Sequence, residues 1–289
     1  MNHVQRNQIL CSSLLPALVL IACGGEAAPI TATVEALGPC VATRFQPGVF
    51  STGADEGRLV FTGDGRHAYF HRSVAPGGVR IFESHLAGGA WSPPMPVSFS
   101  SGYDEEDPFV TPDGRTLYYS SFRPVPGASA PRGDADLWKV ERSGAGWGAP
   151  TYVAAVNTPS NELFPSLTAD GTLYFNSDRP GGVGAWDIYA ARARGGGFDA
   201  PQPLRGAVNT AIWEYNPSLS ADGSLLAFGS LDPDPAAPYS DIFFSLRQGG
   251  AGGAYLPRIN AGPCVNTEQE EYHPTLDLAR GRLIFVRRD

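Results

Sequence analysis

Asp170-Gly171-Thr172-Leu173-Tyr174-Phe175 begins a pattern that recurs along the chain. An Asp-Gly pair favours a tight turn, because Gly tolerates positive φ and Asp hydrogen-bonds within its own turn. The Leu-Tyr-Phe run that follows has the composition of a buried strand. The pattern then continues with Ser177, Arg179-Pro180, Asp187-Ile188-Tyr189, Phe198 and Pro201.

The same order of residues returns elsewhere. One copy has Asp113-Gly114, Leu117-Tyr118-Tyr119, Ser121, Arg123-Pro124, Asp136-Leu137-Trp138, Trp147 and Pro150. Another has Asp222-Gly223, Leu226-Ala227-Phe228, Ser230, Asp241-Ile242-Phe243, Tyr255 and Pro257. A weaker copy begins at Asp64-Gly65, and a fifth begins at Arg280-Gly281 and stops after Leu283-Ile284-Phe285. The period of roughly 50 to 57 residues indicates an array of equivalent structural units.

Each copy has the parts of one four-stranded antiparallel sheet. A single sheet of this kind cannot bury both of its faces, so the units must stack side by side around a central channel. We therefore predict an all-β fold, a β-propeller with five blades. Because the last copy lacks its outer strands, we expect residues 31–50, which carry Phe45-Gln46-Pro47, to complete the final blade and close the ring.

These units resemble the PD40 (WD40-like) repeats of TolB-type β-propellers, on the strength of the Asp-Gly turns and the Leu-Tyr-Phe and Asp-Ile-Tyr strands. The resemblance covers about residues 55 to 289. TolB has six blades and an added N-terminal domain, so the resemblance implies a six-bladed alternative to the five units counted here. It also implies a protein of the bacterial cell envelope.

The composition agrees with many short strands joined by turns. Among 289 residues there are 35 Gly and 26 Pro, while 11% of the chain is aromatic. The net charge is −8, and no basic patch is evident. Nucleic acid is therefore not an expected partner.

The N-terminus has the three parts of a secretory signal peptide. Arg6 lies in a polar segment, residues 9–21 are apolar, and Leu20-Ile21-Ala22-Cys23 resembles the lipobox of bacterial lipoproteins. We expect a signal peptide over residues 1–22, a lipidated Cys23 with a tether over residues 23–39, and the propeller over residues 40–289. The only expected contact with a membrane is the lipid anchor. Gly24, by analogy with lipoprotein sorting in enterobacteria, favours the outer membrane.

Two other cysteines remain in the processed chain, in an oxidising compartment. Cys40 and Cys264 each follow a Gly-Pro pair, near opposite ends of the chain. We predict that they form a disulfide. Two free buried thiols are the alternative.

An acidic residue precedes each copy at an equivalent place, and the five would form a ring at the channel mouth. They are candidate binding residues for a metal ion or a basic peptide, or they accept backbone N–H groups as part of the architecture of every blade. A residue shared by all blades favours the architectural interpretation. The five are Glu56, Glu105, Glu162, Glu214 and Glu271.

Residues that break the pattern are the better candidates for function. They include two acidic clusters, Asp104–Asp107 and Glu268–Glu271 with His273, and the Asp-Pro repeat at residues 232–235. His67 and His71 share one face of a strand, but no third metal ligand is evident, and we expect a half-exposed strand face there. We predict no metal site and no cofactor.

The function expected from these observations is non-catalytic. The propeller would bind a protein, peptide or glycan of the envelope through its channel mouth and loops. One alternative is a glycan-active hydrolase or lyase that uses carboxylates at the channel mouth. A third possibility is a structural subunit of an envelope complex. No catalytic residue is assigned, because the prominent carboxylates recur in every blade and no hydrolase motif is found.

Overall fold

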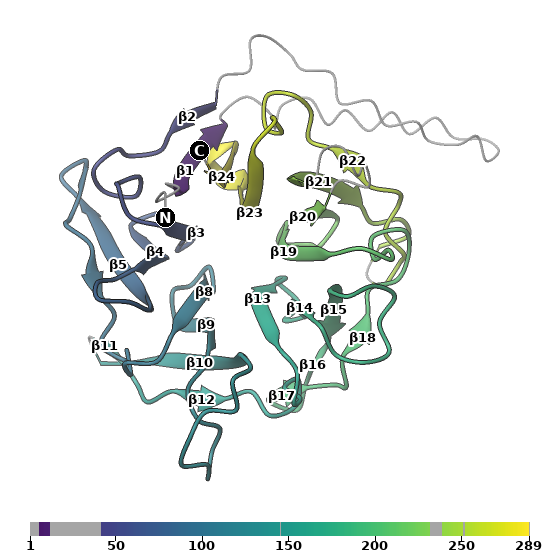
Figure 1. The fold of residues 1–289 in the computed structure, drawn as a ribbon, viewed down its shortest axis with the longest axis horizontal. Helices are drawn as coiled ribbons and strands as arrows, with labels where there is room; N and C mark the ends of the chain where they lie inside the picture. The colour runs from purple at the N-terminus through teal and green to yellow at the C-terminus, as the bar shows by residue number, and fades with distance from the viewer. Residues whose placement is uncertain (1–5, 12–41, 145, 232–238, 251, 289) are drawn as a thin grey trace.

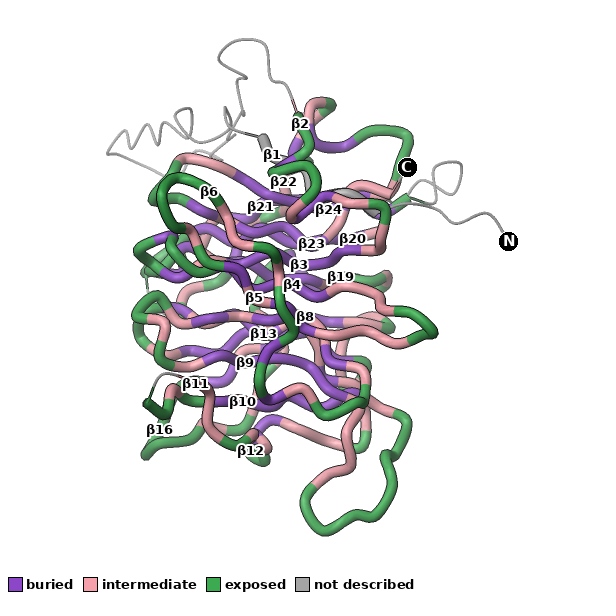
Figure 2. The backbone as a smooth tube through the Cα atoms, turned by 90° about the vertical axis from the view of Figure 1, so that its left-hand side faces the viewer, coloured by how far each residue is buried: buried purple, intermediate pink, exposed green. Residues whose placement is uncertain are grey.

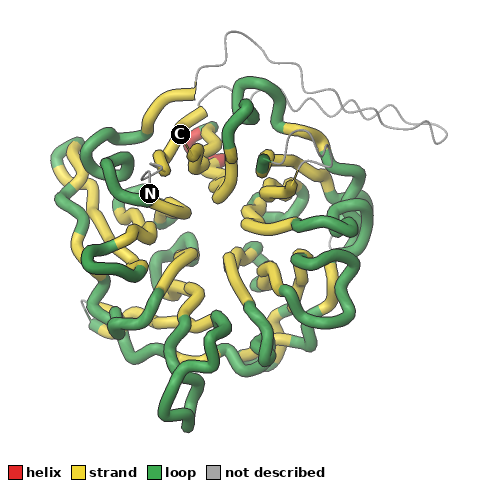
Figure 3. Tube along the Cα trace, viewed as in Figure 1, coloured by secondary structure: helices red, strands yellow, loops and turns green. Residues whose placement is uncertain are grey.

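A computed structural model describes residues 6–11, 42–144, 146–231, 239–250 and 252–288. Five antiparallel sheets stand around a common centre, as Figure 1 shows, and this arrangement confirms the predicted β-propeller. In Figure 3 strands surround the centre of the ring, while loops make up much of its outer edge. Among the described residues, no helix has the length and apolar character needed to cross a membrane.

The first four blades follow one another along the chain, and each begins with the strand nearest the centre. Blade 1 has β3 (Glu56–Phe61), β4 (His67–Ser73), β5 (Val79–Ala87), β6 (Ala90–Trp91) and β7 (Met95–Pro96). Blade 2 has β8 (Glu105–Val110), β9 (Thr116–Ser121), β10 (Asp136–Ser143), β11 (Gly146–Trp147) and β12 (Thr151–Tyr152).

Blades 3 and 4 repeat this plan. Blade 3 has β13 (Glu162–Leu167), β14 (Leu173–Ser177), β15 (Asp187–Ala191) and β18 (Gln202–Pro203), with a small hairpin of β16 (Ala193–Arg194) and β17 (Gly197–Phe198). Blade 4 has β19 (Glu214–Leu219), β20 (Leu225–Leu231), β21 (Ser240–Leu246) and β22 (Ile259–Asn260).

Blade 5 joins the two ends of the chain. Its strand order is β2 (Ala42–Arg44), β1 (Arg6–Cys11), β24 (Arg282–Arg288) and β23 (Glu270–Asp277), and a short 3₁₀ helix, η1 (Leu278–Arg280), precedes β24. We expected residues 31–50 to complete this blade. Of this segment the structure describes residues 42–50, and among these Ala42–Arg44 joins the blade as its outermost strand. The strand that pairs directly with β24 is Arg6–Cys11, which lies inside the expected signal peptide.

The Asp-Gly turns occupy equivalent places between the first and second strands of blades 1 to 4. In each turn the Gly has positive φ, for example +79° at Gly171. The Asp carboxylate accepts a hydrogen bond from the hydroxyl two residues earlier and from the backbone N–H two residues later, as Asp170 does from Thr168 and Thr172. In blade 5, Gly281 takes the same left-handed conformation after η1. This local chemistry explains why the turns could be predicted from the sequence.

The hydrophobic core lies between the blades. Five clusters of buried side chains occupy the five contacts between neighbouring sheets, and Leu173 and Phe175 of blade 3, for instance, pack with Tyr118 and Leu137 of blade 2. Figure 2 shows the buried backbone running through the middle of the stacked sheets, with exposed residues in the connecting loops. Each blade thus buries its faces against two neighbours, as the repeat argument requires.

Candidate functional site

The five recurring glutamates are fully buried, each at the start of a first strand. Glu162 shows the pattern: its carboxylate accepts hydrogen bonds from the backbone N–H and the hydroxyl of Thr158 and from Arg179. The arginine in turn stacks on Phe175 and Tyr189 of the same blade. The corresponding Glu–Arg pairs are Glu56 with Arg72, Glu105 with Arg123, Glu214 with Arg258 and Glu271 with Arg287.

This environment favours the architectural interpretation of the acidic ring. Burial raises the pKa of Glu56, Glu162 and Glu214, while the Thr donors and the paired arginines lower it. A carboxylate that is already paired and hydrogen-bonded inside its own blade has little remaining capacity for a ligand, although Oε2 of Glu105 has no hydrogen-bond partner among the described residues. The five glutamates therefore lock the first strand of each blade to the loop before it.

The residue two positions after each glutamate faces the channel. At this position the first strand of every blade contains a β-bulge, seen as a shift in register. In four blades the bulged residue has positive φ, between 51° and 56°, although none of the four is Gly. Strained backbone of this kind often marks functional sites. The five residues differ from blade to blade: Arg58, Asp107, Phe164, Asn216 and His273.

A hydrogen bond from each of these five residues connects its blade to the preceding blade. Each bulged backbone N–H donates to a side chain of the preceding blade. The donors and acceptors are Asp107 N to His71 Nδ1 (3.0 Å), Phe164 N to Ser120 Oγ (3.3 Å), Asn216 N to Asn176 Oδ1 (3.3 Å), His273 N to Asn216 Oδ1 (3.2 Å) and Arg58 N to His273 Nδ1 (3.2 Å).

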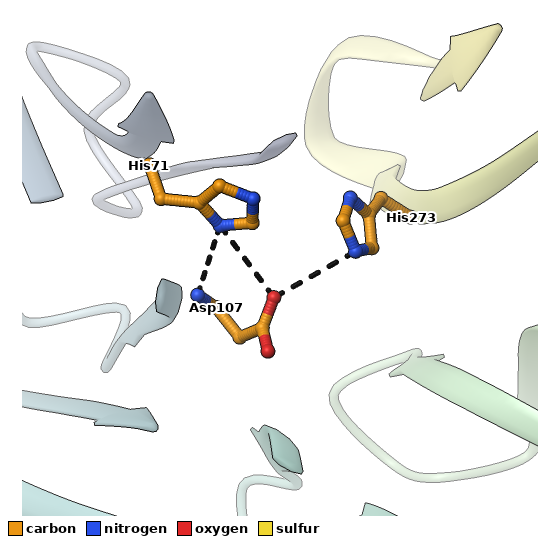
Figure 4. A group of neighbouring side chains, drawn as sticks. All are labelled: His71, Asp107 and His273. Atoms are coloured by element: carbon orange, nitrogen blue, oxygen red, sulfur yellow. Dashed lines mark hydrogen bonds and ion pairs between the residues drawn. The ribbon is translucent and has the colours of Figure 1, made fainter. Parts of the chain in front are cut away.

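His71, Asp107 and His273 form a buried cluster among these residues (Figure 4). Asp107 Oδ1 lies 3.5 Å from His71 Nδ1 and 3.7 Å from His273 Nε2. Burial, and then the charge of Glu106, raise the pKa of Asp107 well above its usual range, while Arg58 acts in the opposite direction. Burial lowers the pKa of Arg58 to about 10, so the guanidinium stays charged at neutral pH.

The three side chains offer ligand atoms within 4.8 Å of one another, so we tested whether they fit a metal ion. In both histidines the Nδ1 lone pair already accepts a backbone N–H, which leaves only Nε2 as a ligand. The backbone of Gly57 lies against His71 Nε2, because a Cβ there would be 1.8 Å from that atom. The buried cation of Arg58 also opposes a second cation. The histidines of the cluster are better described as hydrogen-bond acceptors that connect neighbouring blades, and we assign no metal to the cluster.

An aromatic cleft opens beside this cluster, at the end of the channel where the first strands begin. We use this name for a hollow of about 420 Å³ between blades 3, 4 and 5. Trp213 is 45% exposed, and its backbone forms a bridge with that of Trp186. The cleft is lined by Leu163, Phe164, Asn176, Trp186, Trp213, Tyr215, Leu231, Ser240, Glu270 and Tyr272.

The cleft and the channel cluster are contiguous. The ring of His273 lies 5.1 Å from Phe164 and 4.8 Å from Tyr272, both of which line the cleft. Burial raises the pKa of Tyr215 to about 12, so this side chain is neutral. Asn176 Nδ2 is buried and has no hydrogen-bond partner among the described residues. The cleft thus combines aromatic walls with an amide donor at its floor.

The sequence predicted part of this site. It singled out the clusters containing Asp107 and His273, but it missed His71 as their neighbour and missed the aromatic cleft altogether. The expected half-exposed face of β4 is wrong, because Tyr69 and His71 are buried and only His67 is exposed. A comparison of the residues two positions after each glutamate would have revealed the channel position.

Other predicted residues lie apart from the site or outside the described residues. Asp104 accepts a hydrogen bond from Val79 N and pairs with Arg80. Residues 232–235, Cys23 and Cys40 lie outside the described residues. Cys264 is disulfide-bonded, and its pairing with Cys40 stays a prediction.

The comparisons with known proteins identify the fold. The structure of a putative TolB from Agrobacterium tumefaciens matches with a TM-score of 0.52 and 14% identity, over 100% of this chain and 99% of that one. The fold is a TolB-like β-propeller. No family model matches the chain, and no curated protein matches its sequence.

Two further solved structures are similar at the level of the fold. TolB from Acinetobacter baumannii matches with a TM-score of 0.51 and 15% identity, over 98% of this chain and 64% of that chain. A thermostable family-43 glycoside hydrolase matches with a TM-score of 0.51 and 14% identity, over 78% of this chain and 82% of that chain. At these identities the TolB-like propeller shares an architecture with both groups, and its function must be argued from its own site.

Proposed function

We propose that this TolB-like propeller is a non-catalytic module of the cell envelope that binds a carbohydrate chain in the aromatic cleft. The observation that carries the proposal is the cleft itself, walled by five aromatic rings from three blades beside the channel. Ligand sites are usually concave and largely apolar, with a few polar groups that orient the ligand.

The chemistry of the lining favours an uncharged ligand with apolar faces and hydroxyl groups. Tryptophan and tyrosine rings present flat apolar surfaces together with a polar handle. The one carboxylate among the lining residues, Glu270, pairs with Arg288 at 2.9 Å. The Nδ2 group of Asn176, which has no hydrogen-bond partner among the described residues, can donate to a hydroxyl oxygen. A sugar ring offers an apolar face to the aromatic walls and oxygens to this amide.

The arrangement of carboxylates favours binding over hydrolysis. A glycosidase needs two carboxyl groups on either side of the scissile bond, about 5 to 9.5 Å apart. The recurring glutamates are engaged within their blades, and Asp107 is the one carboxylate among the five bulged channel residues. Binding is therefore the favoured function. The experiment below also tests glycan hydrolysis as the alternative.

The envelope location rests on the sequence. Lipidation of Cys23 would hold the propeller at the membrane, with the outer membrane as the expected destination. Cys23→Ser should release the protein into the soluble periplasmic fraction on cell fractionation. Retention of this variant in the membrane fraction would contradict the anchor while leaving the cleft proposal standing.

The cleft is tested by binding of purified protein to a panel of envelope and plant polysaccharides, measured by calorimetry. Trp213→Ala should weaken binding by about tenfold or more, as for a central aromatic contact. Tyr103→Ala, which removes an exposed aromatic side chain outside the cleft, is the matched control and should bind normally. Binding that is unchanged in Trp213→Ala would overturn the proposal. Binding of peptides but of no polysaccharide would overturn it as well. Release of sugar from the panel, abolished by Asp107→Asn, would establish the hydrolase alternative.

A further inference from the structure

A second cavity lies at the opposite end of the first strands from the aromatic cleft. It has a volume of about 280 Å³ and is lined by all five blades, from Arg58 in blade 1 to Arg280 in blade 5. It lies at the end of the channel that carries the Asp-Gly turns, since Gly63, Pro112 and Ala221, which lie in or beside these turns, belong to its wall. We call it the Arg58 cavity.

Arg58 brings unpaired hydrogen-bond donors to this cavity. The side chain is 2% exposed and crosses the channel, where Nη2 donates to the carbonyl oxygen of Pro217 in blade 4 at 3.2 Å. Its Nε and Nη1 atoms are buried and have no hydrogen-bond partner among the described residues. Leaving a buried donor of a charged group unpaired is costly, so an acceptor is expected there.

A hydroxyl group on the same cavity is also unpaired. Thr275 lines the cavity, and its Oγ1 is buried without a hydrogen-bond partner in the described part of the chain. Thr275 lies four positions after Glu271, and the equivalent residues of blades 3 and 4 are Ser166 and Ser218. Hydroxyl groups therefore occupy the side of the channel toward which Arg58 extends.

The charges around the cavity leave Arg58 without a close anionic partner. Asp277 also lines the cavity, but its carboxylate pairs with Arg280 at 3.0 Å and with Arg282 at 2.7 Å. Asp107 acts on Arg58 through its charge, yet no ion pair within 4.0 Å joins the two among the described residues. Burial raises the pKa of Asp107, which favours the neutral carboxyl group and so weakens its attraction to Arg58.

Apart from Thr62 and Ser220, the remaining walls are formed by apolar residues. They include Val60, Phe109, Leu167, Leu219 and Leu276, each from a different blade. The cavity thus joins a charged floor to hydrocarbon walls, a combination suited to a ligand with an anionic head and a short apolar body. At 280 Å³ it is at or just below the usual size of small-molecule pockets.

We propose that the Arg58 cavity binds a monocarboxylate with a short apolar chain. Its oxygens accept hydrogen bonds from Arg58 Nε and Nη1 and from the hydroxyl of Thr275, and its chain packs against the apolar walls. Such a carboxylate can belong to a free short-chain acid or to the C-terminus of a peptide with an apolar last residue. This site is separate from the aromatic cleft and does not depend on the carbohydrate proposal.

The test uses hexanoate as the probe, titrated into the full propeller by calorimetry. Hexanoate should bind, 1-hexanol and inorganic phosphate should bind at least about tenfold more weakly, and Arg58→Met should reduce hexanoate affinity by at least about tenfold. Arg194→Met, which removes an exposed arginine on the β16–β17 hairpin, is the matched control and should bind normally. A peptide with an apolar C-terminal residue, compared with its amidated form, distinguishes the two sources of carboxylate.

Circular dichroism verifies that each variant is folded. If Arg58→Met fails to fold, Thr275→Val provides the second variant, with an expected loss of several-fold in affinity, and the comparison of hexanoate with 1-hexanol needs no variant at all. Absence of hexanoate binding, equal binding of 1-hexanol or phosphate, or unchanged affinity in a folded Arg58→Met or Thr275→Val protein would each overturn the proposal.

Discussion

The backbone N–H of Arg58 donates a hydrogen bond to His273 Nδ1 at 3.2 Å, although the two residues lie 215 positions apart in the chain. This bond joins blade 1 to blade 5. It completes the set of five hydrogen bonds that connect neighbouring blades around the channel. It also couples the architecture to the candidate sites, because His273 packs against the aromatic cleft and Arg58 forms the floor of the second cavity.

Substitution of His273 tests the closure of the ring. His273→Ala should destabilise the protein by about 1–3 kcal/mol, because the buried N–H of Arg58 loses its acceptor. His273→Asn should lose less, since Asn176 and Asn216 perform the same task in other blades. Urea denaturation followed by fluorescence measures both. His67→Ala, at an exposed position on β4, should change stability by about 0.5 kcal/mol or less. Equal losses for the Ala and Asn variants would contradict this role of His273.

Gly57 should be essential for the position of His71. A Cβ at residue 57 would lie 1.8 Å from His71 Nε2, so Gly57→Ala should displace the imidazole and cost about 1–3 kcal/mol. Ser120 occupies the corresponding place in blade 2, so His71→Ser should relieve the clash and keep an acceptor for Asp107 N. The double variant should therefore be more stable than Gly57→Ala alone, as a double-mutant cycle can measure. Strict additivity of the two changes would refute the argument.

Asp222 should make stability depend on pH in the acidic range. Hydrogen bonds from Ser220 and Ser224 lower the pKa of Asp222 to about 2, below its value in an unfolded chain. The contribution of this carboxylate is present above about pH 4 and is lost as the pH falls toward 2. Asp222→Asn should thus be less stable than the wild type at pH 6, and the difference should shrink at pH 2.5. A difference that stays constant between these two pH values would show that the charged form is not favoured.

The position of strand β1 leads to a prediction about removal of the expected signal peptide. Residues 6–11 pair with residues 283–288 of β24, yet they belong to the expected signal peptide. A chain that begins at Cys23 lacks this strand, so the amides of residues 283–288 that donate to β1 should exchange hydrogen faster than in the full chain. Hydrogen exchange followed by mass spectrometry compares the two proteins, with β14 of blade 3 as the internal reference. Equal protection of β24 in both would mean that β1 is not needed for this blade.

The sequence alone determined the repeat, the turns and the stacking of blades, because these depend on interactions between near neighbours and on apolar faces that every unit must bury. Asp170, Thr168 and Gly171 form their turn from local chemistry, and Glu162 with Arg179 repeats in related form in each blade.

Only the tertiary structure decided which unlike residues meet in the channel. His71, Asp107 and His273 come from three blades; Asp107 and His273 lie in the bulges of first strands, whereas His71 lies on the second strand β4. The aromatic cleft likewise needs Trp186, Trp213 and Tyr272 from neighbouring sheets, and the pairing of Arg6–Cys11 with β24 in blade 5 was not foreseen from the sequence. Closure of a ring brings together residues whose separation in the chain carries no information about their distance in space.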